Sequence, residues 1–132
     1  DWDCATVARR YDFRDAHSAD GRKQPEFLNR NRVKVWIGDG LAADFHRYQY
    51  EAARPHGTEM LLHVGIYAYR AAALRRYAEA GPCEREQAES LEQLRALHIG
   101  LRMGVVFTDR HHAGIDTRAD YDAFVERQRV RS

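Results

Sequence analysis

The sequence lacks the features that would assign it to several large functional classes. Its apolar runs fall far short of the roughly eighteen residues that a membrane helix requires, so we expect no membrane span. Neither charge sign dominates, because 21 basic residues meet 20 acidic ones, and we therefore expect no nucleic-acid partner. The chain also contains no Walker loop, no G-x-S-x-G and no G-x-G-x-x-G. No short catalytic motif therefore identifies an activity.

Cysteine is scarce, and its placement does not favour a metal site. Cys4 and Cys83 are far apart, and the sequence has neither a Cys/His quartet nor an H-E-x-x-H motif. No signal-peptide pattern precedes them, so we expect a reducing, cytoplasmic location. The chain starts at Asp1 rather than at methionine, which suggests a processed chain or a piece of a longer one.

What is present is the composition of an ordinary globular domain. The chain has 132 residues, of which 44% are apolar and 31% charged, and this length favours one domain over residues 1–132. "RVKVWIG" and "LAADFHRY" flank "GDG", which predicts a hairpin over residues 32–48. Other strands are predicted at 3–11, at 63–70 with both faces buried, and at 103–108, with surface loops at 12–31 and 49–61.

Helical signals fill much of the second half. "AAALRRYAEA" predicts a helix at 71–80, ended by Gly81 and Pro82. Apolar residues at helical spacing predict one continuous helix over 84–98. A last helix begins at Thr117, which is followed three residues later by Asp120 in a variant of the capping box. The resulting fold class is α/β, with a mixed sheet, a hairpin and three helices.

Acidic residues crowd the first half of the predicted helix at 84–98. Such residues favour a helix start because of the helix dipole, and this interpretation assigns them no function. Glu89, Glu92 and Gln93, however, are expected on one side of that helix, beside the stripe formed by Ala88 and Leu91. They would then face a cleft at the edge of the core, where carboxylates hold sugar hydroxyls.

Two further residues have both a structural and a functional interpretation. A single histidine at the start of a strand, such as His63, is more often a structural residue than a ligand or base. Asp116 precedes a helix, where an acid favours the helix start, but it also suits Mg²⁺, which uses one or two carboxylates plus phosphate oxygens. Spacing alone does not decide between these alternatives.

Three longer stretches resemble a known family. "LLHVGIYAYRAAALRRY", "EREQAESLEQLRAL" and "GIDTRAD" occur in the order and at the separations found in the C-terminal half of the 3-deoxy-manno-octulosonate (Kdo) cytidylyltransferases, or CMP-Kdo synthetases. "NRNRVKVWIGDGLAADFHR" resembles the hairpin that precedes them. The likeness extends from about residue 28 to 122, is weaker over 3–11 and is absent over 12–27. It implies half of a nucleotidyltransferase fold.

The resemblance also implies an activity and a set of residues. Family members join CTP to the sugar acid Kdo for lipopolysaccharide assembly, releasing pyrophosphate, with Mg²⁺ as cofactor. Carried over by position, Arg47 would meet the carboxylate of Kdo, and Asp116 would bind the metal ion. The region carries much of the family's dimer contact, which implies a homodimer or a nucleotide-binding partner chain. The sugar pocket would be lined by His63, Tyr67, Glu92 and Gln93.

Departures from the family pattern keep other hypotheses open. The nucleotide-binding half, with its CTP loop and first metal aspartate, has no counterpart in these residues. The segments after Arg47, before Glu86 and after Thr117 also differ from the family. One alternative is a non-catalytic dimeric module that binds a sugar acid or serves as a scaffold. Another is the same chemistry with a related sugar acid, although "HVGIYAYR" and "ESLEQLR" favour Kdo.

Overall fold

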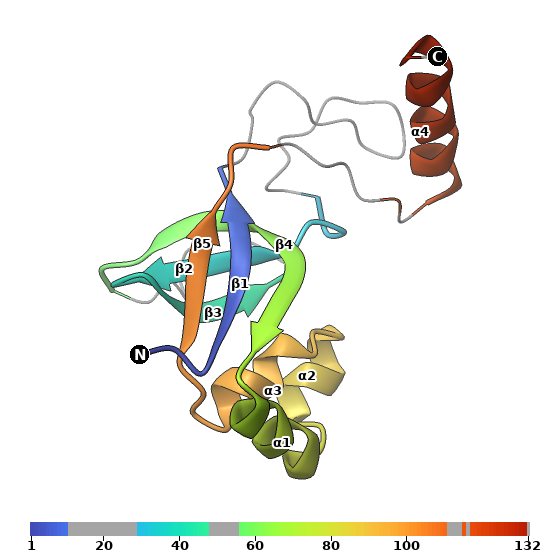
Figure 1. Ribbon diagram of the computed structural model, residues 1–132. Coiled ribbons are helices and arrows are strands. Elements are labelled where there is room, and N and C mark those ends of the chain that lie inside the picture. The colour runs from blue at the N-terminus through green and yellow to red at the C-terminus, as the bar shows by residue number, and fades with distance from the viewer. Residues whose placement is uncertain (11–28, 48–55, 111–114, 116, 132) are drawn as a thin grey trace.

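The computed structural model spans the chain and describes residues 1–10, 29–47, 56–110, 115 and 117–131. Most of the loops expected at 12–31 and 49–61 lie outside these ranges, as does Asp116. Within the described part, the chain forms a small β-barrel with the helices of residues 71–98 packed at one end, and the last helix lies apart from them (Figure 1). No helix in these ranges is both long and apolar enough to cross a membrane.

The strands form a closed barrel in the order β1-β4-β2-β3-β5. β1 and β5 run parallel and the other neighbours are antiparallel, which confirms a mixed sheet. The barrel closes where Leu41 of β3 lies opposite Gly104 of β5. This closure was not predicted, because strand patterns do not show which distant strands meet. The strands are β1 (Cys4–Arg9), β2 (Lys34–Gly38), β3 (Leu41–His46), β4 (Glu59–Tyr69) and β5 (Met103–Phe107).

The predicted hairpin is confirmed as β2 and β3. Asp39 and Gly40 form its turn with φ values of 51° and 74°, the positive values that a tight two-residue hairpin turn requires. Val35 lies between Phe45 on β3 and Leu61 on β4, and all three side chains are buried. Both sides of β2 are covered, so alternation along this strand does not separate a buried face from an exposed one.

β4 lies between β1 and β2 in the barrel wall, and it differs from its prediction in two ways. It begins at Glu59 rather than at residue 63, and its outward face is not buried, since Ile66 is 61% exposed. The expectation of burial on both faces was therefore wrong. Its register with β1 shifts between Thr6 and Val7, which places a bulge next to Gly65. The inward residues of β4 are Leu61, His63, Gly65, Tyr67 and Tyr69.

The helices in the described residues number four rather than three, because the helix expected at 84–98 is broken. Ser90 adopts a left-handed conformation with φ 53° and ψ 51°, which ends one helix before the next begins. At the last helix, Thr117 N donates to Asp120 Oδ2 and Asp120 N donates to Thr117 Oγ1, which confirms the capping box. The helices are α1 (Ala71–Ala80), α2 (Glu84–Glu89), α3 (Gln93–His98) and α4 (Arg118–Arg131).

One hydrophobic core joins the barrel to α1, α2 and α3. Phe45 and Leu61 pack inside the barrel, and the same buried cluster continues through Leu91 and Leu94 into the helical layer. Burying side chains of this size contributes about 1.5 to 3 kcal/mol each. The core therefore holds the turn between α2 and α3 at one end of the barrel. Cys4 and Cys83 are both buried as free thiols.

Candidate functional site

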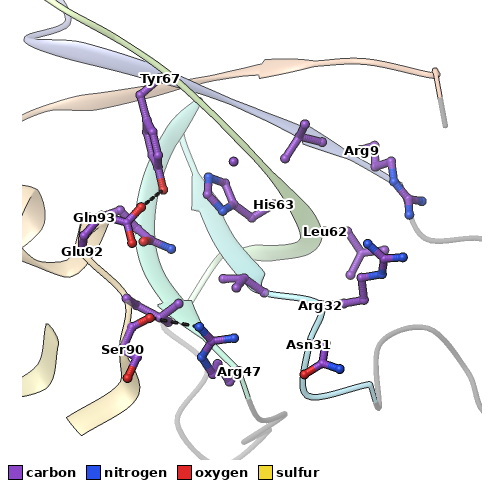
Figure 2. A pocket seen from close by; sticks show the side chains of 14 residues that line it. Arg9, Asn31, Arg32, Arg47, Leu62, His63, Tyr67, Ser90, Glu92 and Gln93 are labelled. Carbon is purple, nitrogen blue, oxygen red and sulfur yellow. Dashed lines mark hydrogen bonds between the residues drawn. The ribbon is translucent and has the colours of Figure 1, made fainter. Parts of the chain in front are cut away.

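A cavity of about 410 Å³ opens between the inward face of β4 and the turn from α2 to α3 (Figure 2). This volume lies within the range of roughly 300 to 1,000 Å³ that is typical of small-molecule sites. The five residues expected to bind the sugar acid all line it: Arg47, His63, Tyr67, Glu92 and Gln93. They come from the residue after β3, from β4, from the α2–α3 turn and from the first residue of α3, so folding gathers residues that are up to 46 positions apart.

His63 contributes a neutral imidazole to the cavity. Thr6 Oγ1 lies 2.8 Å from the carbonyl oxygen of Ile66, which only accepts, so the Thr6 hydroxyl donates there. The contact of 2.9 Å between Thr6 Oγ1 and His63 Nε2 must then be donated by His63. This assignment leaves Nδ1 as an acceptor, and burial lowers the pKa of His63 to about 4. At neutral pH the ring is therefore uncharged.

Tyr67, Glu92 and Gln93 form one polar wall of the cavity. Tyr67 Oη donates to Glu92 Oε1 at 3.1 Å, and burial together with the Glu92 carboxylate raises the pKa of Tyr67. Gln93 is only 2% exposed and lines the cavity, so its amide adds both a donor and an acceptor to this wall. Together with His63, the wall offers donors and acceptors for hydroxyl groups.

Arg47 is held by the break between α2 and α3. Its Nε donates to the carbonyl of Glu89 at 2.8 Å and its Nη2 donates to that of Ser90 at 3.0 Å. A continuous helix would use such carbonyls internally, so the left-handed Ser90 makes this contact available. The expectation that Glu89, Glu92 and Gln93 share one side of a single helix was wrong for the same reason. Glu89 instead pairs with Arg85.

The opposite wall is cationic and was not foreseen. Arg9, Asn31 and Arg32 line it, and in Figure 2 they lie on the far side of His63 from Tyr67 and Glu92. Of the described lining residues, three are arginines and one is a glutamate. Arginine favours carboxylate and phosphate groups. The sequence did contain a signal for this wall, because arginines occur in "ARRY" and "NRNRV" on either side of the 12–28 segment. It does not show, however, that these two stretches lie together in the fold.

No metal site is evident among the described residues. They contain no group of three or more histidines, cysteines, aspartates or glutamates that could hold a metal ion. Asp116, the expected metal ligand, lies outside the described residues, so its role as a metal ligand stays a prediction. The cavity itself is suited to a ligand that carries several hydroxyl groups and an acidic group.

Comparison with known proteins assigns the chain to a family. A family model described as cytidylyltransferase matches residues 9–103. The chain belongs to the cytidylyltransferase family. The match runs from Arg9, the last residue of β1, to Met103, the first residue of β5, and it includes every described residue that lines the cavity. The resemblance seen in the sequence is thereby confirmed at the level of the family.

Individual relatives within the cytidylyltransferases are Kdo enzymes. The 3-deoxy-manno-octulosonate cytidylyltransferase of Bradyrhizobium sp. (strain ORS 278) is 43% identical over 102 residues, which are 75% of this chain and 41% of the relative. That of Rhizobium etli (strain CIAT 652) is 49% identical over 76 residues, which are 57% of this chain and 30% of the relative. The chain spans less than half the length of either relative.

A solved structure shares the fold. It is a CMP:2-keto-3-deoxy-manno-octonic acid synthetase complexed with CTP, and it superposes with a TM-score of 0.73 at 29% sequence identity. The superposition covers 99% of this chain and 51% of that protein. The barrel and helices described above are therefore a substantial part of a known cytidylyltransferase architecture.

Proposed function

We propose that this chain is the sugar-acid-binding half of a Kdo cytidylyltransferase. In the full reaction the anomeric hydroxyl of Kdo attacks the α-phosphorus of CTP. A new oxygen–phosphorus bond forms, the bond to the β-phosphate oxygen breaks, and CMP-Kdo and pyrophosphate result. Such phosphoryl-type transfers depend mainly on positioning and on charge stabilisation. The contribution of this chain is to hold and orient the sugar acid.

One observation carries the proposal: Arg47, His63, Tyr67, Glu92 and Gln93 line a single cavity between a polar wall and a cationic wall. The polar wall suits the hydroxyls of an eight-carbon sugar acid, and the arginines suit its carboxylate. The neutral His63 would accept a hydrogen bond from a ligand hydroxyl at Nδ1 without adding charge to the cavity.

The remaining parts of the proposal rest on the resemblance alone. The proposed assembly is a homodimer or a complex with a nucleotide-binding chain, in the cytoplasm. Mg²⁺, with Asp116 as one ligand, would stabilise the charge on the phosphates of CTP. By the same resemblance, the nucleotide-binding half corresponds to the part of the relatives that this chain does not match.

A chimera tests the proposal. The unmatched part of the Bradyrhizobium relative is joined ahead of Asp1, and pyrophosphate release is measured with CTP, Kdo and Mg²⁺. We expect release that requires both substrates in the chimera and none from the present chain alone. Equal release from the present chain would contradict the half-enzyme proposal.

The alternative of a non-catalytic module predicts a different result. That module would bind Kdo and yet give an inactive chimera. A chimera that is folded, binds CTP and Kdo, and releases no pyrophosphate would therefore support the module. The departures from the family pattern after Arg47 and before Glu86 are the sequence features that support this alternative.

A further inference from the structure

Lys34 is a buried lysine whose place in the fold is unusual. It lies on β2, is 1% exposed, and ranks among the largest fully buried side chains of the chain. Its Nζ donates to the carbonyl oxygen of Asn29 at 2.7 Å and to that of Arg47 at 2.8 Å. Among the described residues, no carboxylate forms an ion pair with it. Lysine is almost never buried without such a partner.

The two carbonyls belong to the two segments that flank the cavity. Asn29 begins a turn that is closed by a hydrogen bond of 3.1 Å from Arg32 N to the carbonyl oxygen of Asn29. This turn carries the lining residues Asn31 and Arg32. Arg47 directly follows β3 and is itself a lining residue. Lys34 is not a lining residue, so it acts on the cavity through the backbone of its neighbours.

Arg47 is consequently fixed from two directions. Lys34 holds its backbone carbonyl, and the carbonyls of Glu89 and Ser90 hold its guanidinium group. Because the backbone and the side chain of Arg47 are each anchored, ligand binding has less conformational entropy to remove. The anchored guanidinium remains on the wall of the cavity.

Among the described residues, the sheet neighbours of Lys34 are a histidine and a leucine, and arginines flank them. In the sheet register, Lys34 lies opposite His46 on β3 and Leu62 on β4, and Leu62 in turn lies opposite Arg9 on β1. Arg47 follows His46, and Arg32 lies in the adjoining turn. Burial and the charge of Arg47 lower the pKa of Lys34 to about 8. An anion in the cavity would offset this repulsion.

We propose that Lys34 is a positioning residue that sets Arg47 and the Asn31–Arg32 turn for the carboxylate of the sugar acid. The proposal rests on the proposed function of the cavity. It also implies that the bound anion and the Lys34 ammonium favour each other. Anion binding should therefore weaken as the pH rises past the range in which the free protein loses the Lys34 proton.

Calorimetric titration with Kdo between pH 6.5 and 9.5 tests this coupling. For the wild-type protein we expect affinity to fall several-fold from pH 7.5 to 9.5. Lys34→Met should bind at least about tenfold more weakly at pH 7 and should lose this dependence on pH. The matched control Arg75→Met removes a charge from an exposed position on α1 and should behave as wild type. Equal affinity and an equal pH profile in Lys34→Met would overturn the proposal.

A second measurement covers the case in which Lys34→Met does not fold. Lys23 and Lys34 are the two lysines of the chain, so ¹³C-lysine labelling gives two side-chain signals in the NMR spectrum. One of them should titrate near pH 8 in the free protein and at higher pH with saturating Kdo. A titration that Kdo leaves unchanged would overturn the coupling. Absence of Kdo binding to wild type at every pH would instead refute the proposed function, and this inference with it.

Discussion

At the scale of single residues, the site depends on groups whose protonation is set by burial. His63 is kept neutral because Thr6 fixes its tautomer and burial disfavours the imidazolium. Its folded-state pKa of about 4 lies below the ordinary value of 6.5, so the unfolded chain binds more protons between these values. Stability therefore falls as the pH drops from 6.5 towards 4 and levels off below that range.

The substitution His63→Gln tests this protonation. The glutamine amide keeps a donor for Thr6 Oγ1 but does not titrate. From pH 7 to 4.5, we expect the wild-type free energy of unfolding to lose about 2 kcal/mol more than that of the variant. Urea unfolding at fixed temperature measures both curves. Parallel curves across this range would mean that His63 titrates normally.

Residues also show why the site was only partly predictable. The polar wall and Arg47 came from family resemblance, while periodicity alone favoured a structural role for His63. Arg9 and Arg32 were missed because their meeting depends on the barrel, which pairs β1 with β4 and β4 with β2. Lys34 was missed because alternation along the strand does not reveal that both of its faces are covered.

At the scale of elements, the α2–α3 break matters most for the site. The apolar spacing of Ala88, Leu91 and Leu94 predicts one helix, but Ser90 interrupts it and turns its carbonyl towards Arg47. Glu92 is the N-cap of α3 and makes no side-chain cap hydrogen bond, so no local capping signal marks the break in the sequence. The other helices and the hairpin were predictable because their caps and turn residues are local.

Substitutions at Ser90 test the strain at this break. A non-glycine residue in the left-handed region costs roughly 1 kcal/mol, and β-branched residues fare worse. Ser90→Gly should therefore raise the free energy of unfolding by about 0.5 to 1 kcal/mol, and Ser90→Val should lower it by about 1 kcal/mol or more. Denaturant unfolding of the two variants measures the difference. Greater stability in the valine variant would contradict the left-handed assignment.

At the scale of the whole molecule, the barrel and its helical cap form a binding unit that spans less than half of its relatives. The described residues form the cavity that we propose for the sugar acid, and the proposal assigns the binding of CTP to the part of the relatives that this chain does not match. The mixed α/β class was predictable because the chain contains both strand-like and helix-like segments with local signals. Barrel closure was not, because it depends on the pairing of β5 with both β1 and β3.

Gly65 offers a direct way to fill the cavity without disturbing the barrel. It lines the cavity, a Cβ built there meets no atom within 4 Å, and its φ lies outside the left-handed region. Gly65→Leu should therefore occupy the ligand's space in a folded protein. Ala68→Leu is the matched control, because it adds the same side chain to the exposed outward face of the same strand.

The most direct measurement is calorimetric titration of Kdo into this chain and into these two variants at pH 7. We expect saturable binding to wild type and to Ala68→Leu, with affinity reduced at least about a hundredfold in Gly65→Leu. Circular dichroism should show the same fold in all three proteins. No binding of Kdo to the wild-type protein, or equal binding to Gly65→Leu, would contradict the central claim that this cavity holds the sugar acid.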